Sequence, residues 1–251
     1  MCIRDRYYAD RIYQINLAIA GIAIGVVILP QLSKHIQSRK KNKILLIQNK
    51  ALELSLFLSL PATIALIIGS EQIISALFGY GSFNENSVNN SSLALYYFAL
   101  GLPAFALIKV FSSFFFANHD TKTPFYISLI SVVLNILISV YYLSYGVSLA
   151  GFLQLIFLYK YVSKYYSLKF SFKLKASDKV KFFFKKLLPS IFSSGVTQIN
   201  ILVGTIIASF EANAVSYLYY ADRIYQINLA IAGIAIGVVI LPQLSRHIQS
   251  R

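Results

Sequence analysis

The stretch YYADRIYQINLAIAGIAIGVVILPQLSKHIQSR occupies Tyr7–Arg39, and Tyr219–Arg251 repeats it with a single change, Lys34 to Arg246. In the first copy, Ile12–Leu29 contains no charged residue. A helix over these residues, at ~1.5 Å per residue, is about 27 Å long, close to the ~30 Å hydrocarbon core of a bilayer. Tyrosines precede the apolar run and Lys or Arg follow it, as is typical of membrane-interface anchors. The pattern predicts a membrane-crossing helix that the chain contains twice.

The composition of the whole chain indicates the same class of protein. Of 251 residues, 57% are hydrophobic and 13% are charged, whereas soluble domains have about 25% charged residues. The formal net charge is +14, but the basic residues lie in short segments between apolar runs, which argues against nucleic acid as a partner. Anionic phospholipids at the cytoplasmic surface are the partner that this charge predicts.

The sequence offers no pattern for catalysis or metal binding. The only cysteine is Cys2, and His35, His119 and His247 have no second histidine or carboxylate at the spacing of a metal site. No Gly-Lys-Ser/Thr phosphate-binding loop occurs. We therefore expect no metal, no cofactor, no enzymatic reaction and no ATP-driven transport by this chain alone.

The apolar segments predict an all-α, polytopic transmembrane helix bundle with about seven membrane-crossing helices. Most segments are near the ~20 residues that a tilted helix needs to cross a bilayer. The expected crossings are Ile12–Leu29, Leu52–Ile68, Leu93–Phe116, Phe125–Leu143, Val147–Leu158, Leu187–Phe210 and Ile224–Leu241.

Basic residues distinguish the two sides of the membrane. Lys and Arg are frequent in 34–50 and 160–186 and absent from 70–92. The positive-inside rule places the first two segments in the cytoplasm and the third outside it. Seven alternating crossings satisfy this assignment for every connecting segment, so we predict a multi-pass membrane protein.

Each copy of the repeated stretch has an Asp-Arg pair and a glutamine at the outer end of its apolar run. Arg11 and Gln14 are three residues apart and share one helical face. The arginine is either an interface anchor, neutralised by the aspartate beside it, or a cation that lines a cavity and binds an anion such as a phosphate. The candidate substrate-binding residues of the two copies are Asp10, Arg11, Gln14, Asp222, Arg223 and Gln226.

Two further candidate substrate-binding residues lie deeper in the expected crossings. Lys109 is about two turns from the cytoplasmic end of its segment, and we expect it to face the interior of the bundle. Gln198 belongs to a row of Ser, Thr and Gln side chains that either hydrogen-bonds a neighbouring helix or lines a cavity. Gly21 and Gly25 have the spacing that permits close helix contact, and we expect only a packing role for them.

Several of these motifs resemble the lipid II flippases of the MurJ/MviN family, in the multidrug/oligosaccharidyl-lipid/polysaccharide (MOP) exporter superfamily. The resemblance covers nearly everything from Tyr7 to Arg251. It implies that the chain moves a lipid-linked peptidoglycan precursor across the bacterial inner membrane by alternating access between two six-helix lobes. It also implies that the essential arginine of the family corresponds to Arg11 and Arg223. The similar stretches are LFGYGSF at 77–83, FFFANHDTKTPF at 114–125, LPSIFSSGVTQINILVGTIIASF at 188–210, YYADRIYQ at 219–226 and GVVILPQLS at 237–245.

The order of the segments differs from that of the family. Residues 7–145 resemble the start of the second lobe, whereas 146–251 resemble the end of the first lobe and the start of the second, with 219–251 repeating 7–39. The opening MCIRDR, residues 1–6, does not belong to the pattern, and we interpret it as a sequencing or assembly scar. One change between the copies is too little divergence for an old lobe repeat. We therefore expect an incomplete or chimeric chain with partial MOP/MATE-like lobes that does not transport by itself; a recent duplication is the alternative.

Other functions remain open at this point. The chain could instead belong to another MOP exporter, for a different lipid-linked polysaccharide or a cationic drug, or to a non-transporting membrane scaffold. A cationic drug calls for carboxylates in the helices, whereas a lipid phosphate calls for cations. Glu53 is the only acid that the sequence places in the body of a helix, which favours the lipid. We expect a monomer.

Overall fold

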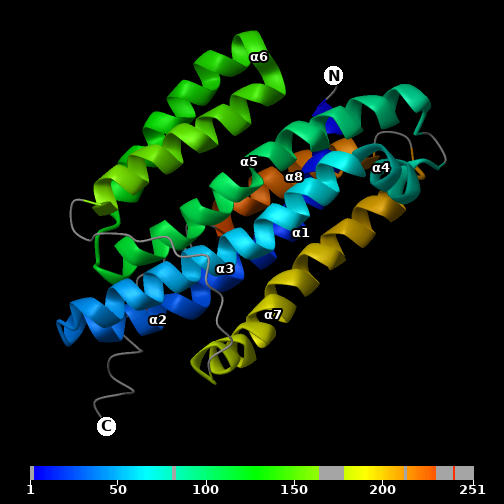
Figure 1. Cartoon of the computed structure of the whole chain (residues 1–251). Coiled ribbons are helices and arrows are strands. Elements are labelled where there is room, and N and C mark those ends of the chain that lie inside the picture. The colour runs from blue at the N-terminus through cyan, green and yellow to red at the C-terminus, as the bar shows by residue number, and fades with distance from the viewer. Residues whose placement is uncertain (1–2, 81–82, 164–177, 212–213, 230–239, 241–251) are drawn as a thin grey trace.

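The computed structural model describes residues 3–80, 83–163, 178–211, 214–229 and 240, where all regular elements are helices (Figure 1). The all-α prediction is therefore confirmed for this part of the chain. α5 lies at the centre of the bundle and contacts α1, α2, α3, α4 and α6. The elements are α1 (Ile3–Leu17), the π-helix η1 (Ala18–Ile22), α2 (Ala23–Gln37), α3 (Lys41–Ile68), α4 (Ser70–Phe78), α5 (Glu85–Ala117), α6 (Lys122–Ser163), α7 (Asp178–Ala208) and α8 (Ala214–Leu229).

α1, η1 and α2 form one continuous helical rod, because the residues at both ends of η1 keep helical backbone angles. The rod is longer than the apolar run that predicted it. Asp10 and Arg11 lie inside α1, about two turns after its start at Ile3. They stand at the start of the apolar run, as expected, but the helix continues before them.

The rod extends this far because its first turns pack against the rest of the bundle. The Tyr8 ring lies 4.5 Å from that of Phe78 and 4.7 Å from that of Phe83, measured between ring centroids. Burial of such aromatic surface stabilises the additional turns. α1 also contains residues 3–6 of the segment that the sequence analysis set apart, and the origin of that segment stays a prediction.

Two glycines bring the rod against α5. A Cβ on Gly21 would lie 2.9 Å from Ala106 Cα, and one on Gly25 would lie 2.7 Å from Ser113 Oγ. Larger residues do not fit at such distances without a shift of the helices. The predicted packing role is confirmed for this copy, while the corresponding glycines of the second copy lie outside the described residues.

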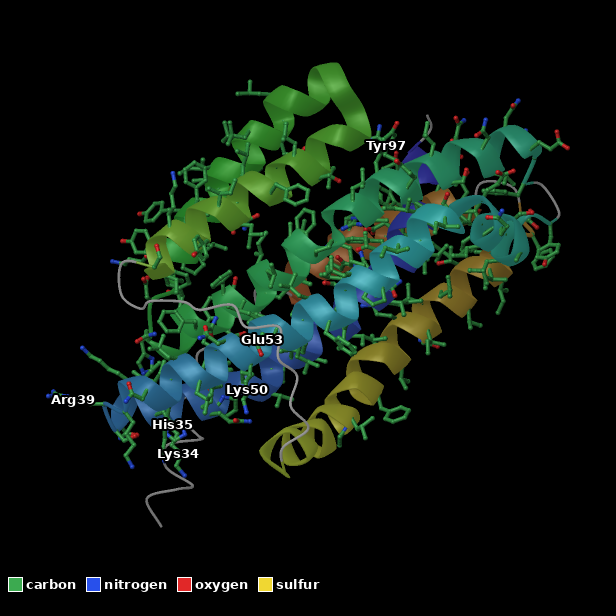
Figure 2. All side chains as sticks on the ribbon, in the orientation of Figure 1. Lys34, His35, Arg39, Lys50, Glu53 and Tyr97 are labelled. Carbon is green, nitrogen blue, oxygen red and sulfur yellow. The ribbon has the colours of Figure 1, made fainter. Side chains whose placement is uncertain are left out.

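The segments expected to be loops are largely helical. Only three residues (38–40) separate α2 from α3, and Arg39, with φ of 50°, lies in this tight turn. The basic residues of 34–50 therefore project from helix ends, and Lys34, His35 and Arg39 lie together at one end of the bundle (Figure 2). The segment 70–92 contains α4 and the first turns of α5, near the opposite end (Figure 1).

α6 reverses its direction along its length. Ser131 Oγ donates a hydrogen bond to Ala150 O at 3.2 Å, and Gln154 Nε2 donates one to Ser128 Oγ at 3.0 Å. A straight helix at ~1.5 Å per residue would separate Ser131 and Ala150 by about 28 Å. α6 therefore consists of two antiparallel legs (Figure 1), which correspond to two of the predicted crossings.

The helices match membrane-crossing segments in length and composition. Within the described residues, four helical stretches are long and apolar enough to cross a bilayer, and two more are apolar but shorter. The seventh predicted crossing lies mostly outside the described residues, so the count of seven stays a prediction. Large apolar side chains such as Phe125, Phe192 and Ile207 are more than 60% exposed on the outside of the bundle, as lipid contact allows. The four long stretches are Asp5–Gln37, Lys41–Ile68, Glu85–Ala117 and Gly146–Ser163, and the shorter ones are Lys122–Leu137 and Gly195–Ala208.

Candidate functional site

The two copies of the repeated motif meet where α8 lies against α1. Arg11 Nη2 lies 2.8 Å from Asp222 Oδ2, and Arg223 Nη2 lies 3.5 Å from Asp10 Oδ2. Within the described residues, each arginine forms its ion pair with the aspartate of the other copy rather than with the aspartate beside it. Adjacent residues on a helix point in directions about 100° apart, so an arginine cannot easily face its neighbour. The copies exchange partners instead.

The tyrosines of the motif show that α1 and α8 run parallel and in register. The Tyr7 ring packs edge to face on that of its own counterpart, Tyr219, with centroids 5.3 Å apart. Each arginine also lies over the tyrosine one turn before it. Arg11 Cζ is 4.3 Å from the Tyr7 ring centroid, and Arg223 Cζ is 5.1 Å from that of Tyr219. These cation–π contacts hold the guanidinium groups between the two helices.

Each glutamine binds the aspartate of its own copy. Gln14 Nε2 donates a hydrogen bond to Asp10 Oδ2 at 2.6 Å, and Gln226 Nε2 donates one to Asp222 Oδ2 at 2.7 Å. Both pairs are four residues apart on one helical face, the spacing at which side chains meet. Each carboxylate is therefore held by an amide of its own helix and a guanidinium of the other.

The two ion pairs differ although their sequences are identical. Arg11 is 1% exposed, and its contact to Asp222 has the length of a charge-assisted hydrogen bond. The Arg223 side chain is 42% exposed, and its contact to Asp10 is 0.7 Å longer (3.5 against 2.8 Å). Arg11 is thus a fixed structural cation, whereas Arg223 is accessible and loosely held.

A cavity of ≈ 570 Å³ lies beside this cluster, lined by α1, η1, α5, α6, α7 and α8. It collects five of the eight candidate site residues, which come from four helices, α1, α5, α7 and α8. The other three are engaged in the contacts between α1 and α8 and do not line it. The five are Asp10, Gln14, Lys109, Gln198 and Arg223, and the three are Arg11, Asp222 and Gln226.

The wall of the cavity carries an excess of positive charge. Arg6, Lys109 and Arg223 contribute three cations, and Asp10 is the one carboxylate among the described residues of the wall. Lys109 is exposed on the side that faces the cavity. Such an arrangement attracts anions and repels cations, and a low-dielectric surrounding strengthens both effects.

Neutral polar atoms on the same wall are available for a ligand. Within the described part of the chain, the buried hydroxyl of Tyr13 and the Oε1 atom of Gln198 have no hydrogen-bond partner. The Nε atoms of Arg6 and Arg223 share this property. Buried polar groups are normally paired, so these atoms mark the cavity as a place where a polar ligand gains hydrogen bonds.

Two residues of the wall were missed by the sequence analysis. Arg6 was set apart with the opening hexapeptide, although it lies four residues before Asp10 and shares its helical face. Tyr13 was treated as an ordinary part of the apolar run. Arg6, Asp10 and Tyr13 are four and three residues apart, so they share one face of a helix that continues toward the N-terminus. This spacing could have identified both residues.

Comparisons with known proteins identify the family of the chain. The family described as "Lipid II flippase MurJ" matches residues 6–143 and 138–251. A probable lipid II flippase MurJ of Rickettsia prowazekii (strain Madrid E) is 34% identical over 241 residues, covering 93% of this chain and 45% of that protein. Another from Rhizobium tropici is 43% identical over 133 residues, covering 53% and 25%. The chain thus spans less than half the length of these relatives.

Two solved structures share the fold. A lipid II flippase MurJ in an inward closed conformation has a TM-score of 0.60 and 23% identity, over 88% of this chain and 48% of that one. An inward-facing MATE-family multidrug resistance transporter of the MOP superfamily has a TM-score of 0.66 and 16% identity, over 92% and 59%. These structures support the MOP-type fold. With both family matches and the shared fold, this membrane-embedded chain belongs to the lipid II flippase MurJ family, whose members reside in the bacterial inner membrane.

Proposed function

We propose that the cavity binds the pyrophosphate of a lipid-linked peptidoglycan precursor, and that the chain carries part of the transport path of a lipid II flippase. The observation that carries this proposal is the group of three cations, Arg6, Lys109 and Arg223, around one carboxylate in a cavity between apolar helices. Charged side chains inside a membrane are costly unless they are paired. A pyrophosphate supplies the negative charge that this wall lacks.

The residues on the wall suit a phosphate in detail. Arg223 presents a planar guanidinium that can donate two parallel hydrogen bonds to phosphate oxygens, and it is accessible. Lys109 adds a point charge from α5, while the hydroxyl of Tyr13 and the amide of Gln198 add neutral contacts. Binding and release of a phosphate need no covalent step, so the proposal involves no enzymatic reaction.

The charge of the wall also argues against a cationic substrate. Asp10 is a carboxylate in the body of a helix, so the expectation that Glu53 is the only one is wrong. Asp10 is nevertheless already bound to Arg223 and Gln14, and three cations outnumber it. A cationic drug would meet net repulsion, which disfavours the drug exporter as an alternative.

We further propose that the basic end of the bundle contacts anionic phospholipids. Lys34 and Arg39 are exposed around the turn between α2 and α3 (Figure 2), and so is Lys40. Each basic residue near an anionic leaflet contributes about 1 kcal/mol of attraction. These contacts would fix the cytoplasmic side of the protein, which we propose to be a monomer.

The two matches to one family support the proposal that the chain is chimeric. They overlap at 138–143, next to the boundary expected at 145. Under this proposal each lobe is represented only in part. We propose that this chain binds substrate but does not transport it, because alternating access requires two complete lobes. Long-read sequencing across both copies tests the arrangement, and one unbroken reading frame containing both would reject it.

Binding of lipid II to the purified full chain in lipid nanodiscs tests the proposed function. We expect lipid II to bind and a polyprenol of the same length without phosphate not to bind, because the recognised group is the pyrophosphate. Equal binding of the two lipids would show that the cavity recognises the hydrocarbon chain and would reject the proposal.

A further inference from the structure

Asp10 holds an unusual position on the wall of the cationic cavity. Its carboxylate lies 3.5 Å from the accessible Arg223 and is held in place by Gln14 at 2.6 Å. All three side chains line the cavity. Arg223, which the proposed function needs for phosphate binding, therefore already has an anionic partner within the protein, Asp10.

We propose that Asp10 is a specificity residue, an internal competitor that admits pyrophosphate lipids to Arg223 and excludes lipids with a single phosphodiester. The inference rests on the proposed function and adds a selection rule to it. Such a rule would keep the cationic cavity free of the anionic phospholipids that surround it in a bilayer. Specificity of this kind comes from a repulsive element as well as from attraction.

The charges give the physical reason. A phosphodiester carries one negative charge. When it binds Arg223 it takes the place of the Asp10 carboxylate, so Arg223 gains no additional attraction and Asp10 is left beside a like charge. A pyrophosphate carries at least two, and it can contact Arg223 while it also neutralises Lys109 and Arg6 of the same wall. These additional attractions offset the repulsion from Asp10, whereas a single phosphodiester has too little charge to do so.

The second copy of the motif shows that the position of the carboxylate decides its role. Asp222 has the same neighbours in sequence and the same hydrogen bond from a glutamine. Its arginine, Arg11, is 1% exposed, and neither residue lines the cavity. The two carboxylates are about equally exposed, at 23% for Asp222 and 25% for Asp10, but only Asp10 lines the cavity, where a ligand can meet it.

The test compares two probes on the full chain in nanodiscs of neutral lipid. Farnesyl pyrophosphate represents pyrophosphate lipids, and a short-chain phosphatidylglycerol represents single phosphodiesters. The wild type should prefer farnesyl pyrophosphate. Asp10→Asn keeps the shape of the side chain and removes its charge. It should therefore raise the affinity for phosphatidylglycerol about tenfold and reduce the preference for farnesyl pyrophosphate over phosphatidylglycerol. Glu71→Gln, an identical loss of charge at an exposed site on α4, should leave the preference unchanged.

A positioning role for Asp10 predicts different changes in the affinities of Asp10→Asn for the two probes. If Asp10 only orients Arg223, Asp10→Asn should weaken farnesyl pyrophosphate binding and leave phosphatidylglycerol binding low, and this result would overturn the inference. An unchanged preference would overturn it as well, while pyrophosphate binding by the wild type would leave the proposed function standing. If the wild type binds neither probe, both fail. Asp10→Ala provides a second variant, and thermal unfolding confirms that each variant is folded.

Discussion

Arg11 and Asp222, which are 211 positions apart in the sequence, form an ion pair of 2.8 Å in which the Arg11 side chain is 1% exposed. The equivalent pair, Arg223 with Asp10, is longer and lies on a cavity wall. Identical sequences thus occupy different environments. α1 is covered by α3, α5, α7 and α8, whereas α8 contacts α1 and α7 at the edge of the bundle.

This difference predicts unequal effects of the same substitution in the two copies. Asp222→Asn removes the carboxylate that lies 2.8 Å from the buried Arg11 and should lower the free energy of unfolding by about 3 kcal/mol. Asp10→Asn affects a partly exposed pair and should cost about 1 kcal/mol or less. Thermal unfolding in detergent measures both variants. Equal losses would contradict the assignment of Arg11 as the structural cation.

The glycine contacts give a second prediction that also has an internal control. Gly21→Ala places a Cβ 2.9 Å from Ala106 Cα, which forces the rod away from α5 and should destabilise the fold by about 1–3 kcal/mol. Gly204→Ala, in α7, has no atom within 4 Å of the new Cβ and should stabilise its helix by up to about 1 kcal/mol. A neutral Gly21→Ala variant would show that this close approach does not hold the rod.

Sequence reasoning found the helices and five of the fourteen described residues that line the cavity, because both follow from local patterns. Apolar length predicts a crossing, and Lys109 and Gln198 are conspicuous as polar residues within such runs. The partner exchange between Arg11 and Arg223 could not be predicted, since it depends on α8 lying parallel to α1. Arg6 was missed because the apolar pattern begins only at Ile12, although tertiary packing starts the helix earlier.

Topology can be tested at two exposed positions in a background without the single cysteine, Cys2. Asn86 lies in the first turn of α5, and Ser38 lies in the turn between α2 and α3, near opposite ends of the bundle (Figure 1). Because the basic end should be cytoplasmic, Asn86→Cys should react with an impermeant thiol reagent added to intact cells, and Ser38→Cys should not. The reverse labelling pattern would invert the orientation of the bundle.

The central claim is that Arg223 binds the pyrophosphate of the substrate. The most direct measurement is the affinity of the full chain for lipid II with Arg223→Ala, compared with Lys34→Ala, an exposed cation at the basic end. Loss of a charge-assisted contact of about 1.5–3 kcal/mol predicts a ten- to hundredfold weaker affinity for Arg223→Ala. Arg223→Lys should bind with intermediate strength, because it keeps the charge without the bidentate geometry, and Lys34→Ala should bind like the wild type. Wild-type affinity of a folded Arg223→Ala variant would contradict the claim.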